Sequence, residues 1–422
     1  MCGLIKVFEI PQLDEQELKS KLASVRFPNE FADSEQVGWR CGTPSWAVKE
    51  LISAWRHNFD WERKRQDLSK LQHYVTEIQN LNLHFVHEPS LRSEAIPIIL
   101  IHGWPSTFYE FHKLVEPLKS SETQAFHVVL PSLPGYGFSE APRLDGSCSL
   151  FEMAAMFHEL MQRLGYEKYM VYGTDWGAMI GTQMANAYPE HCMGFLTNMP
   201  SAMPPLPNFR NLITRPYRVF LFILSIFMGV EAIYGKDESK NLSKRAFANC
   251  DKDDSAGYRA IQSTRPYTLA YGLTDSPVGL LGWMLEPYHA WSYFDSEEQY
   301  ETRALPSTIT VDEFLTQVTI YWITNTMSSS YRLYYETKKN DLKSVIDLGK
   351  SSIKVPVAVS YFENEAFKMP KDWLDVTFKL VQYRTHKKGG HFPALEAPEL
   401  LLKDISDFAV KIKQNIDGKK TN

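Results

Sequence analysis

The stretch of sequence that decides the fold is "YGTDWGAMIG", from Tyr172 to Gly181. The short apolar run "KYMVYG" leads into it, and small residues fill the turn before a helical pattern begins. Gly173 and Gly177 stand two positions on either side of Asp175, as a sharp strand-to-helix turn requires, because the backbones approach each other closely there. Such a turn lifts its central side chain out of the sheet. Many hydrolases present a serine in this way, whereas this sequence predicts that Asp175 is presented.

The same pattern has a second interpretation. An aspartate just before a helix is also a common N-cap, whose carboxylate accepts backbone N–H bonds and does no chemistry. The turn alone does not separate the two, so the rest of the chain must decide.

The surrounding sequence predicts an α/β fold with a mostly parallel central sheet. Short apolar runs alternate with helical patterns in "PIILIHGWP", "FHVVLPSLPGYGFS", "LFEMAAMFHELMQRLG", "KYMVYGTDWGAMIG" and "CMGFLTNMP". Nearly continuous apolar strands are typical of parallel sheets that are buried on both faces.

The rhythm of the sequence divides the chain into five parts. Residues 1–92 form a polar N-terminal extension, helical in "TPSWAVKELISAWRHNFDWERKRQDLSKLQHY" and ending in the strand "LNLHFVHEP". Residues 93–200 and 344–415 carry the two parts of the α/β core. Between them, residues 201–343 are aromatic and helical, as expected of a cap over the carboxyl ends of the strands, where open α/β sheets bind ligands. Residues 416–422 are a polar tail.

Composition excludes several classes of function. The formal net charge of −5 has both signs interspersed, which argues against a nucleic-acid partner. The five cysteines are scattered, without the close spacing of metal or redox motifs: Cys2, Cys41, Cys148, Cys192 and Cys250. We therefore expect no metal, no cofactor and a reducing compartment. The first residues lack the apolar core of a signal peptide, so we expect a cytoplasmic protein or one peripheral to an intracellular membrane.

One uncharged run, "VFLFILSIFMGV" at residues 219–230, raises the question of a membrane. It is shorter than the roughly 20 residues that a spanning helix needs. We expect a buried or cavity-lining helix there, and the alternative is an element that dips into a membrane surface.

A histidine near the C-terminus supplies the context for Asp175. In "GGHFPALEAPELL", His391 follows a strand and precedes the final helix, in the chain order nucleophile, acid, histidine of α/β-hydrolases. The acid is expected after the strand "VPVAVSYFE", where Glu363 and Glu365 are both candidates that spacing does not separate. Either one could orient His391 and stabilise its imidazolium.

The loop "HGWP" directly after a core strand suggests an oxyanion hole. One backbone N–H is expected from Trp104, and the second from Trp176, the residue after the nucleophile. Beside the turn and the histidine, this loop makes a catalytic interpretation of Asp175 the better one.

An aspartate in this position predicts displacement at a saturated carbon. A serine would form a stable ether there, whereas Asp175 forms an ester whose carbonyl water can attack. Ionised Asp175 needs no base to attack, so His391 is free to activate that water. The enzyme is thereby regenerated.

The leaving group distinguishes the two enzymatic interpretations. A halide needs weak N–H donors, whereas an epoxide oxygen becomes an alkoxide and needs acidic O–H donors such as tyrosine. The expected cap offers Tyr258 in "AGYRAIQ" and the cluster Tyr331, Tyr334 and Tyr335 in "SSSYRLYYE".

Taken together, the chain resembles the microsomal-type epoxide hydrolases, including the related juvenile-hormone and fungal or bacterial enzymes. The resemblance covers nearly the whole chain through "WRHNFDWERKRQDLSKLQHYVTEIQNLNLHF", "HGWP", "PSLPGYGFS", "GTDWGA", "STRPYTLAYGLTDSPVGLLGWMLE", "YWITNTMSSSYRLYYE" and "GGHFPALEAPELL". Thr174 departs from the Gly-Gly-Asp of the family, at a position that the chemistry does not require. The mammalian members begin with a membrane-anchoring helix, which we do not expect in this chain.

The resemblance implies a role for each site residue. It makes Asp175 the nucleophile, His391 the base, Glu365 rather than Glu363 the acid, and Tyr258 and Tyr334 the ring-opening pair. The implied partners are a small apolar epoxide and water, with peripheral membrane contact and a homodimer left open. The alternatives are a haloalkane dehalogenase, which "HGWP" and the tyrosines disfavour, and a non-catalytic receptor for an apolar ligand, which would not need nucleophile, base and acid together.

Overall fold

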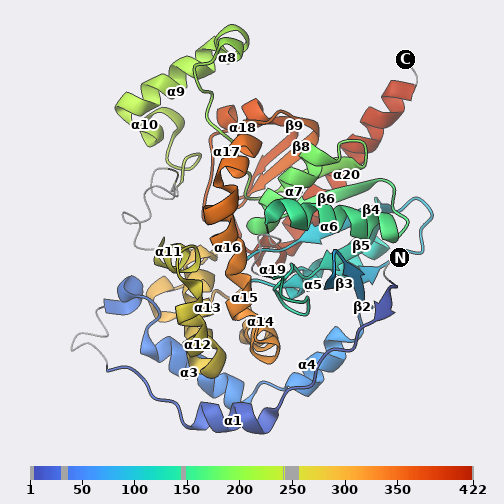
Figure 1. The fold of residues 1–422 in the computed structure, drawn as a ribbon. Coiled ribbons are helices and arrows are strands. Elements are labelled where there is room, and N and C mark those ends of the chain that lie inside the picture. The colour runs from blue at the N-terminus through green and yellow to red at the C-terminus, as the bar shows by residue number, and fades with distance from the viewer. Residues whose placement is uncertain (1–3, 30–36, 144–148, 241, 243–255, 421–422) are drawn as a thin grey trace.

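The computed structural model describes residues 4–29, 37–143, 149–240, 242 and 256–420. In these residues nine strands form one sheet in the order β1-β2-β3-β5-β4-β6-β7-β8-β9 (Figure 1). Strands β1, β2 and β3 pair antiparallel, as do β3 and β5, and the pairs from β5 to β9 are parallel. The strands are β1 Lys6–Val7, β2 His73–Ile78, β3 Leu81–Glu88, β4 Ile96–Ile101, β5 Phe126–Pro131, β6 Tyr169–Gly173, β7 Cys192–Thr197, β8 Ile353–Tyr361 and β9 Phe378–Thr385.

Both faces of the parallel part of the sheet are buried. Ile98 and Leu100 of β4 pack in one hydrophobic cluster with α5 and α20, whereas Ile99 and Ile101 pack in another with α6 and α7. Successive side chains of a strand point to opposite faces, so the continuous apolar run fills both cores. The core helices are α5 His112–Ser120, α6 Leu150–Arg163, α7 Trp176–Ala187, α18 Lys371–Thr377, α19 Pro393–Glu396 and α20 Pro398–Lys420.

The N-terminal extension contains a hairpin that the helical pattern did not predict. Its helices are α1 Glu15–Ala23, η1 Gly38–Cys41, α3 Ser45–His57 and α4 Trp61–Leu68, and β2 already begins at His73. The turn to β3 places Gln79 and Asn80 at φ of 53° and 61°. Two consecutive positive φ values characterise a type I′ hairpin. Such a turn is usually recognised in a sequence by a glycine at one of these two positions, and neither position is glycine here.

The described residues between β7 and β8 are helical; α11 to α15 gather beside the sheet, whereas α8 to α10 lie apart from them (Figure 1). We propose that residues 201–343 form the cap between the two parts of the core, although the boundary at 343 falls inside α17. The helices of this cap are α8 Phe209–Thr214, α9 Pro216–Met228, α10 Val230–Tyr234, α11 Gly257–Gln262, α12 Pro266–Asp275, α13 Pro277–Trp291, η5 Tyr300–Thr302, α14 Val311–Thr324, α15 Met327–Ser330, α16 Arg332–Glu336, η6 Thr337–Asp341 and α17 Leu342–Lys350.

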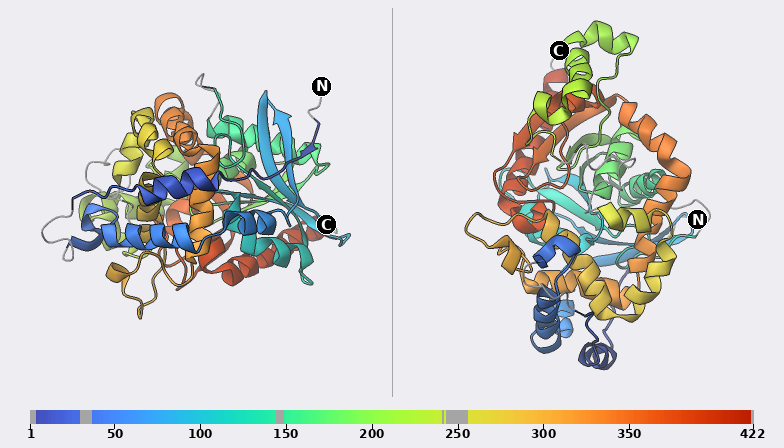
Figure 2. Two further views of the ribbon diagram at one scale, coloured as in Figure 1. Left: turned by 90° about the horizontal axis from the view of Figure 1, so that it is seen from below. Right: turned by 90° about the vertical axis from the view of Figure 1, so that its left-hand side faces the viewer.

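The N-terminal extension contacts both the sheet and the cap. Strands β1 to β3 lengthen the sheet, while the helices of the extension run along the cap (Figure 2). Three polar contacts join it to three cap helices: Lys21 Nζ to Asp275 Oδ1 of α12 at 2.9 Å, Thr43 Oγ1 to the Gly282 oxygen of α13 at 2.9 Å, and Lys64 Nζ to Asp312 Oδ2 of α14 at 2.6 Å.

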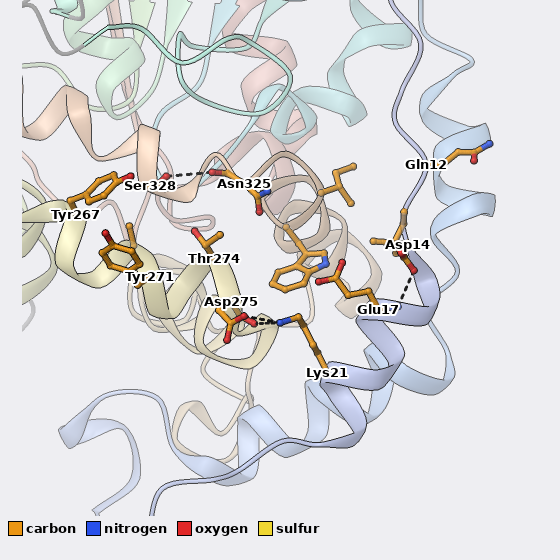
Figure 3. Close-up of a pocket in the computed structure, with 14 residues that line it drawn as sticks. Gln12, Asp14, Glu17, Lys21, Tyr267, Tyr271, Thr274, Asp275, Asn325 and Ser328 are labelled. Carbon is orange, nitrogen blue, oxygen red and sulfur yellow. Dashed lines mark hydrogen bonds and ion pairs between the residues drawn. The ribbon is translucent and has the colours of Figure 1, made fainter.

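A cavity of about 730 Å³ lies in the seam between the extension and the cap (Figure 3). The Lys21–Asp275 ion pair crosses it, and Tyr267 and Tyr271 line its cap side. None of the predicted catalytic residues lines this cavity.

The prediction of a buried helix at residues 219–230 is wrong. In α9 only Val219 and Ser225 are buried, and Phe227 is 81% exposed. Apolarity all round a helix usually indicates burial. Here, however, the helix lies at the margin of the molecule and packs on α18 along one side only. No helix among the described residues is both long and apolar enough to cross a bilayer.

Candidate active site

Asp175 occupies a strained turn between β6 and α7. Its φ of 50° and ψ of −123° are unusual for a residue other than glycine. A Cβ on Gly173 would lie 2.1 Å from the Gly177 oxygen, and one on Gly177 would lie 2.0 Å from the Ile101 oxygen. Asp175 does not act as an N-cap, because its side chain makes no capping hydrogen bond to α7. The turn therefore points the carboxylate away from the helix.

Replacing Gly177 with alanine is expected to destabilise the protein by about 3 kcal/mol or more, since the new methyl group would overlap a backbone carbonyl that cannot move aside. Denaturant unfolding measures the loss. The matched control is Gly272→Ala in α12, where a Cβ meets nothing within 4 Å. Removing a glycine from an exposed helix should stabilise by about 0.5–1 kcal/mol. Equal effects of the two substitutions would contradict this account of the turn.

The "HGWP" loop binds the carboxylate of Asp175 through a backbone N–H group. The Trp104 N–H donates to Asp175 Oδ1 at 2.9 Å. His102 stiffens the loop, since its Nδ1 lies 3.0 Å from the Gly103 oxygen and its Nε2 accepts the Leu133 N–H at 3.1 Å. Burial lowers the pKa of His102 to about 4, so this ring stays neutral and plays a structural part.

Trp176, the second predicted donor, is the first residue of α7. Its N–H belongs to the amino end of the helix, where the free N–H groups and the helix dipole favour negative charge. Its ring packs edge-on against Tyr334, with centroids 4.8 Å apart.

His391 bridges Asp175 and Glu365. Its Nε2 lies 3.6 Å from Asp175 Oδ2, and its Nδ1 lies 2.6 Å from Glu365 Oε1. His391 and Glu365 are buried, whereas the Glu363 side chain is 40% exposed and lies 3.7 Å from Lys387. Of the two acid candidates, Glu365 is thus the one in contact with the histidine.

The charge on His391 depends on its two carboxylate neighbours. Burial lowers its pKa, but the charge of Glu365 and the hydrogen bonds to Asp175 and Glu365 outweigh this and raise the pKa to about 10. Part of that increase comes from the charge of Asp175.

Asn198 is a site residue that the sequence did not reveal. It directly follows β7, and its Nδ2 donates to Glu365 Oε2 at 2.6 Å, while its Oδ1 accepts the Tyr172 O–H at 2.9 Å. The Ala366 N–H donates to the other oxygen, Glu365 Oε1, at 2.7 Å. Glu365 is thereby fixed from both sides. A polar residue at the carboxyl end of an apolar strand was the available signal.

An Asn198→Ala variant is expected to slow turnover about tenfold to a hundredfold, because a hydrogen bond to a buried charge is worth roughly 1.5–3 kcal/mol. Steady-state rates of the variant and the wild type measure the loss. Tyr172→Phe removes the hydrogen bond to Asn198 Oδ1 but leaves the bond from Asn198 to Glu365, so it should cost less. A larger loss from Tyr172→Phe would contradict the assigned order of contacts.

The loop that carries His391 is tied to the cap. The His391 N–H donates to the Trp291 oxygen at 2.9 Å, and a Cβ on Gly390 would lie 2.4 Å from that same oxygen. Glu396 accepts the N–H groups of Phe392 at 3.0 Å and Tyr293 at 2.6 Å. The spacing of residues in the sequence did not predict that Glu396 would bind these two N–H groups.

Three of the four candidate tyrosines, Tyr258, Tyr331 and Tyr334, lie next to Trp104. The Tyr258 ring stacks on the Trp104 ring with centroids 5.1 Å apart, and the Tyr334 ring meets the Trp104 ring edge-on at 6.1 Å. The rings of Tyr258 and Tyr334 are themselves 6.1 Å apart. Tyr335, in contrast, lies under Lys339 at 6.0 Å.

Tyr334 is held in its protonated form. Burial, with smaller contributions from Tyr258 and the charge of Asp175, raises its pKa well above the usual value. A phenol in this state can donate a hydrogen bond to an oxygen in the site. Tyr331 is also buried, with its ring 6.4 Å from that of Trp104, whereas Tyr334 lies close to Trp176 as well, at 4.8 Å between ring centroids.

Within the described residues no group of three or more histidine, cysteine or acidic side chains could hold a metal ion. Cys41 and Cys192 are free thiols, and the other three cysteines lie outside the described residues.

Comparisons with protein-family models and with known proteins both identify epoxide hydrolases as similar to this chain. Residues 6–111 match the family model "Epoxide hydrolase N terminus", and residues 96–223 match that of the alpha/beta hydrolase fold. Epoxide hydrolase 1 of Sus scrofa is 34% identical, over 97% of this chain and 89% of its own length. Juvenile hormone epoxide hydrolase of Bombyx mori is 32% identical, over 95% and 85%.

Solved structures of epoxide hydrolases have a fold similar to that of this chain. The crystal structure of juvenile hormone epoxide hydrolase from Bombyx mori has a TM-score of 0.82 at 29% identity, covering 98% of this chain and 95% of that one. The Aspergillus niger epoxide hydrolase has a TM-score of 0.78 at 28% identity, covering 97% of each chain. The predicted α/β-hydrolase fold is confirmed, and the chain belongs to the epoxide hydrolase family.

Proposed function

We propose that this epoxide hydrolase opens an apolar epoxide through an ester on Asp175 and releases a vicinal diol. The observation that carries the proposal is the placement of Asp175, with one oxygen bonded to the Trp104 N–H and the other 3.6 Å from His391 Nε2. A carboxylate so placed can attack a saturated carbon, and the histidine stands beside the ester that results.

In the first step a carboxylate oxygen of Asp175 bonds to an epoxide carbon, and the carbon–oxygen bond of the ring breaks. The departing oxygen takes a proton from the phenol of Tyr334 or Tyr258. In the second step His391 takes a proton from water, the hydroxide adds to the ester carbonyl, and the backbone N–H groups of Trp104 and Trp176 stabilise the oxyanion. Collapse breaks the bond between the ester carbonyl and the diol oxygen, which takes the proton of the added hydroxyl, so that the diol leaves and Asp175 returns to its carboxylate. The proton held by His391 then passes through solvent to the tyrosinate, which restores both groups.

The aromatic surroundings favour a bulky apolar substrate. The rings of Trp104, Trp291, Tyr258 and Tyr334 lie within 7 Å of one another in pairs, for example Tyr258 and Trp291 at 5.4 Å. Apolar sites with a few convergent polar groups are typical of small-molecule pockets. A haloalkane dehalogenase would have no use for the two phenols.

Heavy-oxygen water tests the ester directly. With enzyme in excess over an aryl epoxide, the first diol should carry little solvent oxygen, because its new oxygen comes from Asp175. Mass spectrometry of the peptide that contains Asp175 should then show the label in the protein. Label in the first diol with none in that peptide would mean direct attack by water and would end the proposal.

The two steps are expected to differ in their dependence on pH. Ester hydrolysis requires neutral His391, so its rate should fall as the pH drops through the pKa of His391 in the ester form. That pKa lies below the value of about 10 in the free enzyme, because the charge of Asp175 is gone. Ring opening, which needs ionised Asp175 and protonated phenols but not neutral His391, should persist to lower pH. Stopped-flow traces that separate the steps check this, and identical acid limbs would contradict it.

A further inference from the structure

The loop that carries Trp104 is held from the cap by two side chains of α14. Gln317 Nε2 donates to Ser106 Oγ at 3.1 Å, and Gln317 Oε1 accepts the Thr107 hydroxyl at 2.6 Å. The Tyr321 O–H donates to the backbone oxygen of Ser106 at 3.0 Å. Three hydrogen bonds therefore join one cap helix to a loop segment that begins two residues after Trp104.

All of these polar groups lie in the interior. Gln317 and Thr107 are fully buried, and Ser106 and Tyr321 are 1% exposed. Thr107 Oγ1 also accepts the Tyr109 N–H at 3.2 Å, and it donates its own proton to Gln317, which agrees with the orientation of the amide. A buried amide that is bonded at both ends holds its partners in one geometry, because breaking either bond leaves a buried polar group unpaired.

Helix α14 is itself fixed to the α/β core. Glu313 in its first turn lies 2.7 Å from Lys113 Nζ and 3.2 Å from His112 Nε2, both on α5. Gln317 and Tyr321 are four residues apart, so they project from one face of the helix. The loop is thus bonded to an element that cannot shift without also breaking its contacts with the core.

The N–H of Trp104 has different tasks in the two steps of the reaction. It donates to Asp175 Oδ1, which becomes the carbonyl oxygen of the ester when Oδ2 attacks the epoxide. During ring opening, negative charge leaves the carboxylate, so a donor at Oδ1 gives the transition state no extra stabilisation. During ester hydrolysis, negative charge develops on that same oxygen, and the donor must lie where the charge forms. A displaced Trp104 N–H should therefore slow the second step selectively.

We propose that Gln317 and Tyr321 are positioning residues for ester hydrolysis, which hold the Trp104 N–H where the oxyanion develops. This role rests on the proposed function and assigns a further part of it to the cap. The chain continues from α14 through α15 to α16, which carries Tyr334 (Figure 1). One segment of the cap thereby supplies a proton donor for the first step and fixes an oxyanion donor for the second.

Single-turnover kinetics of the full chain with styrene oxide test this role, because acid quenching and intact-mass spectrometry follow the formation and the decay of the ester separately. Gln317→Leu removes both bonds of the amide and should slow ester decay about tenfold, less than the roughly 10²–10³-fold lost when an oxyanion donor is removed outright. Ester formation should stay within about twofold of the wild type, so that the variant accumulates as ester. Tyr321→Phe removes one bond and should slow decay about threefold. It keeps the test open if the Gln317→Leu protein does not fold.

Thr319→Val is the matched control on the same helix. Thr319 is fully buried, and its hydroxyl has no hydrogen-bond partner among the described residues, so the substitution removes a buried hydroxyl without touching the loop. Ester formation and ester decay should both match the wild type in this variant.

A merely structural role for Gln317 and Tyr321 would give a different result. Their variants would then melt at a lower temperature or contain less active protein, while both rates per active site stayed at the wild-type values, and this would overturn the proposal. Equal slowing of ester formation and ester decay would overturn it as well. If the wild-type protein itself formed no ester, the proposed function would be refuted, and the positioning role with it.

Discussion

A His391→Gln variant is expected to form one equivalent of ester on Asp175 and then to stall. Ring opening needs the carboxylate and the phenols, which the substitution leaves in place, whereas ester hydrolysis loses its base. General-base catalysis contributes about 10²–10⁴-fold, so steady turnover should fall by that factor. Intact-mass spectrometry should show the protein heavier by one substrate molecule, and peptide mapping should place the addition on Asp175.

The size of this effect follows from the contacts of the histidine. His391 is buried between two carboxylates, with Nδ1 on Glu365 and Nε2 toward Asp175, and among the described residues no second histidine contacts Asp175. A His391→Gln/Asp175→Ala variant serves as the control and should show no adduct. An adduct on another residue, or turnover close to that of the wild type, would refute the assigned roles.

Loss of both phenols should arrest the other half of the cycle. In a Tyr258→Phe/Tyr334→Phe variant the epoxide oxygen would leave as an alkoxide without an acid. One well-placed donor to a developing oxyanion is worth about 10²–10³-fold, so removal of both should slow ring opening by roughly a thousandfold or more. Single-turnover measurements should show no ester accumulating, in contrast to the His391→Gln variant.

Tyr335→Phe is the matched control for the tyrosine pair. It removes a phenol from the same helix as Tyr334, at a residue that faces Lys339 rather than Trp104. Its rate should stay within about twofold of the wild type, as expected for a substitution remote from the reacting atoms. If the Tyr258→Phe/Tyr334→Phe variant still formed ester at the normal rate, a different proton donor would have to exist.

The elbow at Asp175 could be predicted because its requirements are local. Small residues two positions on either side of an exposed side chain are readable in any sequence, and the structure shows why Gly173 and Gly177 admit nothing larger. The choice between Glu363 and Glu365 is different, because both follow β8 closely. Only the path of the chain after the strand decides which carboxylate turns toward His391.

Other features depend on contacts that no local pattern contains. The apolarity of α9 is visible in the sequence, but what covers a helix depends on its place in the molecule, and α18 supports only one side. Asn198 acts through Glu365, which lies 167 residues further along the chain. The hairpin at Gln79 and Asn80 lacks the glycine that would have predicted it.

The bridge that the N-terminal extension makes between sheet and cap has a consequence for engineering. Lys21, Thr43 and Lys64 join the extension to α12, α13 and α14, so these helices do not form an independent module. A chimaera that kept its own extension but received a cap without Asp275 and Asp312 would lose both ion pairs, and would keep only the bond from Thr43 to a backbone oxygen. Exchanging both segments together should preserve them, which makes the pair, rather than the cap alone, the unit of recombination.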